Sequence, residues 1–281
     1  MITPPTSLLG RRRFLTALAG VTGGAVLVAA CGGDSSGSAT TADTTGATTA
    51  GESTTTAATA GESTSTTSAT ATATPGETGG PFPADGTNDN GEGEVANVLA
   101  DPRSVRRDIR SDLDGANTQE GVPFELSVAV VDSGGAPLPG AAVYIWHCNR
   151  DGEYSQYNSS MLGGDFSDFS WLRGVQVADA NGEVQFLTIL PGRYPGRAFH
   201  IHFAVYADDT YSNLLLTSQM AVDDNVIDAL YAQADGYAAS LSNDTDNARD
   251  NIFSDGVDHQ LLTVTGDAGA GLAATFTAVV A

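Results

Sequence analysis

The feature that most constrains the fold is an alternation of apolar with polar or small residues that begins at Phe124. The apolar members of the first run are Phe124, Leu126, Val128 and Val130. Because successive side chains of a β-strand point to opposite faces, this pattern predicts a strand with one buried face. Comparable runs, separated by turn residues, lie within residues 124–149, 174–192, 197–207, 213–222, 258–266 and 272–281. Many short strands joined by turns predict an all-β fold, a β-sandwich.

One segment departs from this pattern, because residues 223–240 have the spacing of a helix. Apolar residues at positions 226, 230 and 231 fall on one side of such a helix, and Asp223 or Asp224 can cap its start. We therefore expect one short helix beside the sandwich.

The N-terminal residues 1–30 have the features of an export signal, with three arginines followed by an apolar run. R-R-R-F-L at residues 11–15 matches the twin-arginine pattern, and V-A-A-C at residues 28–31 resembles a bacterial lipobox. We expect cleavage before Cys31, lipidation of Cys31, and an extracytoplasmic protein anchored to the bacterial cell membrane. The alternative is a spanning helix, which needs about 20 apolar residues; the apolar run here is shorter and rich in glycine.

Residues 31–80 consist mainly of Ser, Thr, Ala, Gly and Glu, without a large apolar side chain. Such a segment cannot bury enough surface to offset the entropy of ordering it, so we expect a disordered tether. The remaining residues, 81–281, are long enough for one domain with its own core.

The composition is strongly acidic, with 12 Lys and Arg against 34 Asp and Glu, a formal net charge of −22 and no lysine. Such a surface repels nucleic-acid phosphates, so we exclude nucleic-acid binding and expect a small or neutral partner. Contact with a membrane is expected only through the lipid anchor. If Cys31 is lipidated, Cys148 has no partner for a disulfide.

Two histidines, His200 and His202, stand two residues apart within the apolar run 197–207. In a strand they share a face, opposite to Phe199 and Ile201. Two parallel imidazoles on one face can bind a single metal ion. A pair of surface histidines on a solvated face is the alternative interpretation.

Two tyrosines, Tyr154 and Tyr194, and one arginine, Arg197, extend this candidate site. Ionising a tyrosine at pH 7 costs about 4 kcal/mol, because its ordinary pKa is about 10. A bound cation must supply that free energy. A hard trivalent ion such as Fe(III) does so through anionic oxygen, whereas Zn(II) usually takes sulfur, nitrogen or carboxylate ligands.

The motifs around these residues resemble the intradiol ring-cleaving dioxygenases, the family of catechol 1,2-dioxygenase and protocatechuate 3,4-dioxygenase. The resemblance runs from about residue 78 to the C-terminus, and its matching segments are residues 103–110, 137–157, 171–203 and 214–222. It implies a prealbumin-like β-sandwich that binds a non-haem Fe(III) ion. The implied ligands are Tyr154, Tyr194, His200 and His202.

The same resemblance implies the reaction, in which O2 opens a catechol-type ring between the two hydroxylated carbons to give a muconate-type diacid. Tyr194 is the implied ligand that leaves the metal when substrate binds. Arg197 is the implied arginine beside the substrate, and Gln219 the implied active-site glutamine. Tyr157 is an alternative ligand, but we prefer Tyr154, which follows the D-G turn that the family pattern requires.

Other functions remain open on the sequence alone. P-L-P-G-A-A-V-Y-I-W at residues 137–146 is also typical of prealbumin-like surface modules that bind carbohydrate or a small ligand without catalysis. A mononuclear metal hydrolase could use the same strand. We expect His147, His259 and Cys148 to serve the fold or the surface. The helical region through which longer family members dimerise is not expected here, and the sequence leaves the oligomeric state open.

Overall fold

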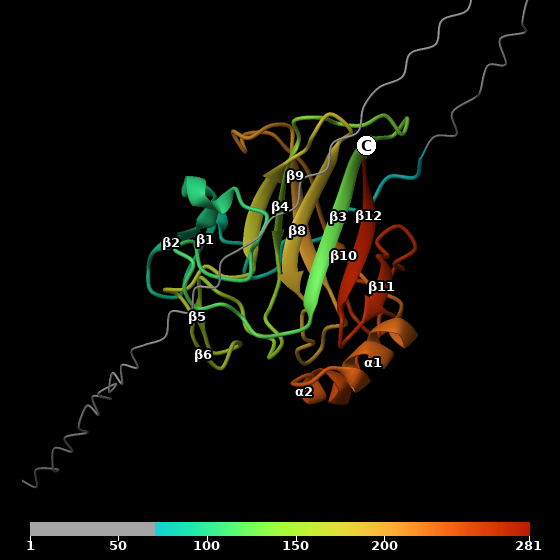
Figure 1. The fold of residues 1–281 in the computed structure, drawn as a ribbon. Helices are drawn as coiled ribbons and strands as arrows, with labels where there is room; N and C mark the ends of the chain where they lie inside the picture. The colour runs from blue at the N-terminus through green and yellow to red at the C-terminus, as the bar shows by residue number, and fades with distance from the viewer. Residues whose placement is uncertain (1–70) are drawn as a thin grey trace, which may run out of the picture. The chain divides into compact units, whose positions relative to one another are not determined.

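Two four-stranded β-sheets face each other in the part of the chain that the computed structural model describes, residues 71–281 (Figure 1). The predicted all-β sandwich is therefore confirmed. The first sheet has the strand order β10-β9-β4-β7, with all neighbours antiparallel. Its strands are β4 (Ala142–Trp146), β7 (Arg173–Val177), β9 (Ile201–Tyr206) and β10 (Leu214–Met220).

The second sheet has the order β11-β12-β3-β8, and here β12 pairs parallel to β3 while the other neighbours are antiparallel. Its strands are β3 (Pro123–Asp132), β8 (Glu183–Ile189), β11 (Thr263–Asp267) and β12 (Gly271–Val280). A turn at Asn181-Gly182 precedes β8, and the amide of Gly182 donates to the carbonyl of Asp179 at 3.0 Å.

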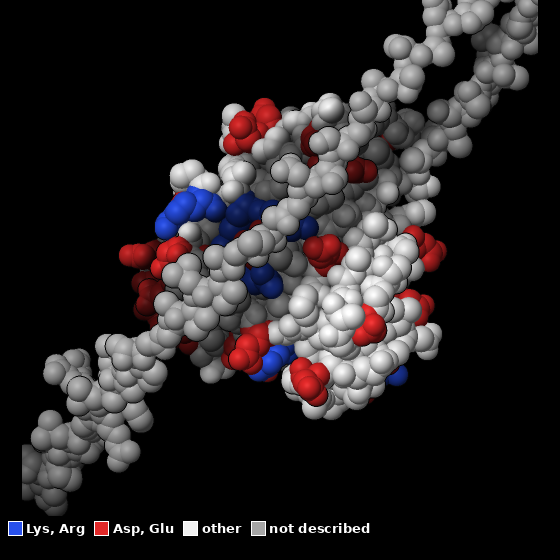
Figure 2. Space-filling view, viewed as in Figure 1, with Lys and Arg blue, Asp and Glu red and all other residues white. Residues whose placement is uncertain are grey.

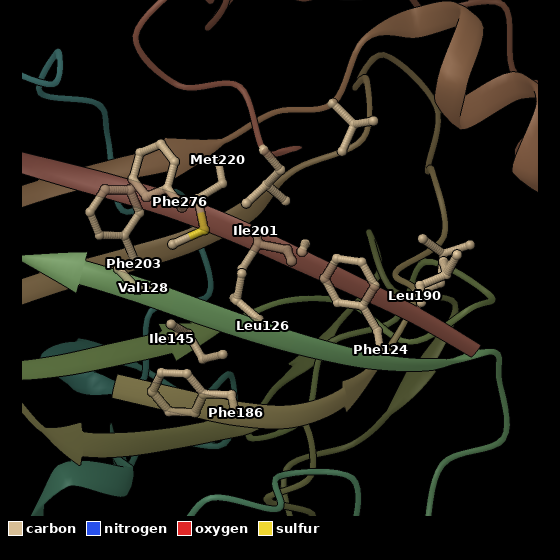
Figure 3. Close-up of a cluster of buried hydrophobic side chains, with 14 of the residues drawn as sticks. Phe124, Leu126, Val128, Ile145, Phe186, Leu190, Ile201, Phe203, Met220 and Phe276 are labelled. Carbon is tan, nitrogen blue, oxygen red and sulfur yellow. The ribbon is translucent and has the colours of Figure 1, made fainter. Parts of the chain in front are cut away.

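The core between the sheets is built from the residues that the alternation placed on one face. In β3 every second side chain from Phe124 to Val130 is buried, and Figure 3 shows Phe124, Leu126 and Val128 among side chains from the other strands. Ile201 and Phe203 of β9 point into this core. Burial of this apolar surface is the main term that stabilises the sandwich.

The first sheet is buried on its other face as well. All five residues of β4 and all six of β9 are buried, and a second apolar cluster contains Tyr144, Trp146, Tyr154 and Tyr206. Short elements cover this face, and the sequence did not predict them: β1 (Asp85–Asp89), β2 (Val95–Asn97), β5 (Asn158–Ser159), β6 (Gly164–Asp165) and two 3-10 turns, Val98–Ala100 and Pro102–Ser104.

Two helices lie together at one end of the sandwich in place of the single predicted helix (Figure 1). They are α1 (Asp224–Gln233) and α2 (Ala238–Ser242). Asp223 caps α1 by accepting from the amides of Asn225 and Val226. The helix stops before Gly236, whose φ of 87° is outside the helical range. Ile227, and not Val226, faces the core together with Leu230 and Tyr231.

The expected tether boundary at residue 80 needs correction. Residues 71–84, here called the N-terminal strap, pack on the sandwich instead of extending from it. The amides of Ala71, Thr74 and Glu77 donate to the carbonyls of Ser133, Val279 and Thr217 at 3.0, 3.0 and 2.8 Å. Backbone pairing therefore orders residues 71–80, which carry no large apolar side chain. The expected signal, Cys31 and the rest of the tether lie outside the described residues.

Acidic side chains are spread over the visible face of the molecule, whereas basic side chains gather on the side where β1 and β2 lie (Figure 2). This distribution follows the acidic composition. Within residues 71–281 no helix is long and apolar enough to cross a membrane.

Candidate metal centre

Tyr154 is held by a tight turn that follows β4. The side-chain oxygen of Asn149 accepts from the amides of Asp151 and Glu153, both at 3.0 Å, which closes the turn. Gly152 has a φ of 89°, and a Cβ at this position would lie 3.0 Å from the Cβ of Tyr194. Glycine is therefore needed both for the turn and for the close approach of the two tyrosines.

The two histidines lie at the start of β9, on the face opposite to the main core, as the alternation predicted. Both are buried, so the alternative of solvated surface histidines is wrong. His200 Nδ1 lies 2.9 Å from the carbonyl of Ala198, which assigns the proton to Nδ1 and leaves a lone pair on Nε2. The ring of His202 stacks on Trp146, with centroids 5.0 Å apart and planes 3° apart.

Three donor atoms of the predicted ligand set converge on one point. The hydroxyl oxygens of Tyr154 and Tyr194 lie 3.1 and 3.2 Å from His200 Nε2. Ligand atoms about 2.1 Å from one ion and about a right angle apart lie about 3 Å from each other. The ring of His202 stands perpendicular to that of His200, with centroids 5.0 Å apart, and its buried Nδ1 has no partner within residues 71–281. This donor set fits a single ion.

The electrostatics of the centre keep all four side chains neutral in the absence of a cation. Burial raises the pKa of Tyr154 well above its ordinary value and also raises the pKa of Tyr194. Burial lowers the pKa of both His200 and His202 well below the usual value. Neutral imidazoles are the metal-binding form, and the phenols need a strongly charged cation to ionise them. The chemistry of the set therefore favours a hard trivalent ion.

Arg197 and Gln219 border these donors. Arg197 Nη1 lies 3.4 Å from the Tyr194 hydroxyl and 3.3 Å from His200 Nε2, and its Nη2 donates to Gln219 Oε1 at 2.5 Å. Gln219 in β10 is the Cα partner of His202 in β9. The glutamine that the resemblance implied therefore lies directly opposite a candidate metal ligand in the sheet.

Asp250 is a residue of this site that sequence reasoning did not identify. Its carboxylate is fully buried and accepts from Arg197 Nε with both oxygens, at 2.8 and 3.1 Å. It also accepts from the amides of Ala198 and Ile252 at 2.8 and 2.9 Å. Asp250 therefore fixes both Arg197 and the backbone that enters β9. It comes from an irregular segment without periodicity, which is why no pattern indicated it.

The N-terminal strap closes the site from another side. The carbonyl of Thr78 accepts from Gln219 Nε2 at 2.8 Å, and Phe82 packs on Tyr154 with ring centroids 5.1 Å apart. Gly80 has a φ of 69°, and a Cβ there would lie 3.1 Å from Cε1 of His202. The strap thus contacts the glutamine and two candidate ligands, although its composition suggested a tether.

The remaining candidates lie elsewhere. The hydroxyl of Tyr157 donates to Asn88 Oδ1 and accepts from the amide of Ala84, so it is occupied away from the histidines. His147 is buried between the carbonyl of Cys148 and the hydroxyl of Thr188. Cys148 is buried with a free thiol, and His259 is exposed. Within the described range no group of three or more His, Cys, Asp or Glu side chains can hold a metal, so the tyrosine–histidine set is the candidate.

Comparison with known proteins agrees with this chemistry. Residues 103–259, more than half of the chain, match the family model described as Dioxygenase. Over 155 residues the chain is 30% identical to a catechol 1,2-dioxygenase of Acinetobacter baylyi, and the match covers 48% of each protein. Over 103 residues it is 34% identical to the beta chain of a protocatechuate 3,4-dioxygenase of Burkholderia cepacia, covering 32% of this chain and 40% of that one.

The chain belongs to the intradiol dioxygenase family, although it spans about half the length or less of the curated relatives it matches. Among solved structures, an intradiol ring-cleavage dioxygenase from Tetranychus urticae has a TM-score of 0.58 at 22% identity, covering 75% of this chain and 95% of that one. This likeness shows that the two proteins share the sandwich fold.

Proposed function

We propose that this protein is a non-haem Fe(III) dioxygenase that cleaves catechol-type rings between the two hydroxylated carbons to give muconate-type diacids. The observation that carries the proposal is the convergence of Tyr154 and Tyr194 on His200 Nε2, at 3.1 and 3.2 Å, with His202 beside them. A carbohydrate-binding or ligand-binding surface module needs none of these buried groups. Fe(III) bound there would draw electron density from a bound catechol so that a ring carbon reacts with O2.

The two tyrosines differ in a way that suits different roles. Tyr154 is fully buried against Phe82, whereas Tyr194 is half-buried on a loop whose next residues, Pro195 and Gly196, are exposed. Tyr194 can therefore swing out and make room for a substrate oxygen, while Tyr154 cannot move without disturbing the apolar cluster. This supports Tyr194 as the ligand that leaves when substrate binds.

Arg197 is oriented to stabilise negative charge on the substrate. Its Nη1 faces the Tyr194 hydroxyl and His200 Nε2, so a substrate oxygen that replaces Tyr194 would come within hydrogen-bond reach. The guanidinium is held by Asp250 and Gln219 and needs no reorganisation during the reaction. Gln219 is in turn fixed by the carbonyl of Thr78.

The proposal is tested by measuring the iron content, the visible absorption and the oxygen uptake of the purified protein. We expect about one iron per chain, a broad visible band from tyrosinate ligation that shifts when catechol is added without O2, and oxygen uptake with a ring-opened diacid as product. A colourless, iron-free protein that leaves catechol untouched would favour the surface binding module. Bound metal without oxygen uptake would favour a metal hydrolase.

We further propose that the protein is exported by the twin-arginine route and is lipid-anchored through Cys31. The motifs at residues 11–15 and 28–31 support this proposal. Twin-arginine export carries folded proteins, which suits a domain that binds its metal before it leaves the cytoplasm. The residues between Cys31 and the N-terminal strap would then hold the domain away from the membrane.

A further inference from the structure

The positive charge nearest the proposed substrate site is already paired with a buried carboxylate, and its remaining N–H group faces the candidate metal ligands. Arg197 has a side chain that is 11% exposed, and it is paired with the fully buried Asp250 at 2.8 Å. Its Nη2 is taken by Gln219 at 2.5 Å, and its Nη1 faces the candidate ligands. No edge of this guanidinium is left for the bidentate contact by which arginine recognises a carboxylate.

Arg193 and Arg173, which lie close to candidate ligands or to their apolar surroundings, cannot substitute for it. Arg193, next to Tyr194, forms an ion pair with Asp228 at 2.7 Å. Arg173 is 1% exposed and donates to Ser155 and to the carbonyl of Pro83, beneath the apolar cluster. Residues 71–281 contain no lysine. The remaining arginines of residues 71–281 pair with carboxylates or, in the case of Arg106, donate to backbone carbonyls, so this part of the chain offers no free cation to an anionic ring substituent.

A carboxylate also lies at the edge of the site. Gln260 Nε2 donates both to the carbonyl of Gln219 at 3.1 Å and to Glu77 Oε1 at 3.3 Å, so Glu77 is placed beside the glutamine that holds Arg197. Glu77 is half-buried in the N-terminal strap, and burial together with the neighbouring negative charge of Asp255 raises the pKa of its carboxyl, while Arg197 acts in the opposite direction. Because Arg197 balances the charge of Asp250, the negative charges of Glu77 and Asp255 remain in excess at this edge of the site.

We propose that this site selects uncharged catechols and discriminates against catechols with an anionic ring substituent, with Glu77 as a specificity-determining residue. The inference rests on the proposed function and narrows it. A substituent carboxylate would meet Glu77 without a cation in compensation, and in a partly desolvated site that repulsion costs free energy. An amide of the same shape would meet no such repulsion.

The experiment uses two nearly isosteric substrates, 3,4-dihydroxybenzamide and 3,4-dihydroxybenzoate, with catechol as the reference. With the iron-loaded protein at low salt, we expect kcat/KM for the amide to exceed that for the carboxylate by about tenfold. Anaerobic titration of the visible band should give dissociation constants in the same order. The preference should shrink as ionic strength rises, because screening weakens repulsion between charges at a protein surface.

Two variants test whether the charge of Glu77 causes the preference for the amide substrate. Glu77→Gln should lower the preference for the amide by about threefold, whereas Glu183→Gln should leave it unchanged. Glu183 is a suitable control because it is exposed on the outer face of β8, in the other sheet. If neither substituted compound is turned over, their inhibition constants against catechol must show the same order.

The outcomes distinguish this inference from the proposed function. If catechol is cleaved and the carboxylate performs as well as the amide, or if the preference is insensitive to salt and to Glu77→Gln, the inference is overturned while the dioxygenase assignment stands. If the iron-loaded protein cleaves neither catechol nor the amide, the proposed function itself fails, and the inference falls with it.

Discussion

Trp146 lies flat against His202, with ring centroids 5.0 Å apart and planes 3° apart, and the two residues are Cα partners across β4 and β9. The indole therefore fixes the orientation of an imidazole that we assign as a metal ligand. Contacts that orient ligands typically contribute 10–100-fold to metal affinity. The stacking thus links the packing of the second apolar cluster to the metal centre.

Replacing Trp146 should weaken iron binding before it abolishes the fold. We expect Trp146→Ala to lower iron affinity by about 10-fold or more and to destabilise the protein by about 3–5 kcal/mol. Trp146→Phe keeps an aromatic face against His202 and should retain most of the iron. Competition with a chelator and urea unfolding measure the two effects. Equal iron affinity in the wild type and both variants would contradict a role for this stacking.

The ligand assignment is tested by removing one candidate donor group at a time. Tyr154→Phe should abolish the visible band and the activity together, and His200→Ala should do the same. Tyr157→Phe is the matched control, because it removes a hydroxyl that contacts Asn88 and Ala84 instead of the histidines. It should keep its iron and its colour. Full colour in both Tyr154→Phe and His200→Ala, measured by absorption and elemental analysis, would show that the ligand list is wrong.

Much of this architecture follows from local patterns in the sequence. The alternation around Phe199 and Ile201 predicted which face of β9 carries the two histidines, and Asp223 was correctly expected to start a helix. These features depend on residues within one element. The prediction that Val226 lies on the buried side of the helix was wrong, because Ile227 is buried there instead. Helical spacing defines an apolar stripe along the helix, but it does not determine which of two adjacent apolar residues packs on the core.

The contacts that complete the site could not be predicted in this way. Asp250 reaches Arg197 from 53 residues away, and Thr78 reaches Gln219 from 141 residues away. Neither residue lies in a periodic segment, and Thr78 acts through its backbone carbonyl, which carries no sequence signal. A bulge between Leu214 and Leu216 likewise shifts the pairing of β10 ahead of Gln219, and the period-two pattern does not indicate it.

The ion pair between Arg197 and Asp250 makes a specific prediction about stability. Arg197→Ala should retain iron and slow turnover, but it also leaves the buried Asp250 carboxylate without its counter-charge, which costs about 3–5 kcal/mol. Adding Asp250→Asn to that variant should recover a substantial part of the loss. Urea unfolding of the single and double variants measures this. A double variant less stable than Arg197→Ala by the full effect of Asp250→Asn alone would show that the two residues do not interact.

The proposed lipid anchor gives a prediction that is independent of the enzyme site. Cys31→Ser should release the protein from the membrane fraction into the soluble extracytoplasmic fraction, because the lipidated thiol is lost. Replacing Arg11 and Arg12 by lysine should instead retain the protein in the cytoplasm. Cell fractionation with immunodetection measures both. Membrane association that survives Cys31→Ser would favour a spanning segment, the alternative left open by the sequence.

His147 should make the stability of the fold depend on pH. Burial lowers the pKa of its imidazole to about 4, and the ring is held neutral between the carbonyl of Cys148 and the hydroxyl of Thr188. In the unfolded chain the imidazole takes up a proton near pH 6.5. Between pH 6.5 and 4 the unfolded state therefore binds more protons, and the free energy of unfolding falls as the pH falls.

The contribution of His147 is fully present above pH 6.5, and about 3 kcal/mol of it is lost by pH 4. Urea unfolding of the wild type and of His147→Gln across this range should give curves that converge toward low pH, because only the wild type loses this term. His259→Gln is the control, since His259 is exposed, and its curve should run parallel to that of the wild type. Parallel curves for His147→Gln would mean that the imidazole has the same pKa in the folded and unfolded protein, which its two buried partners argue against.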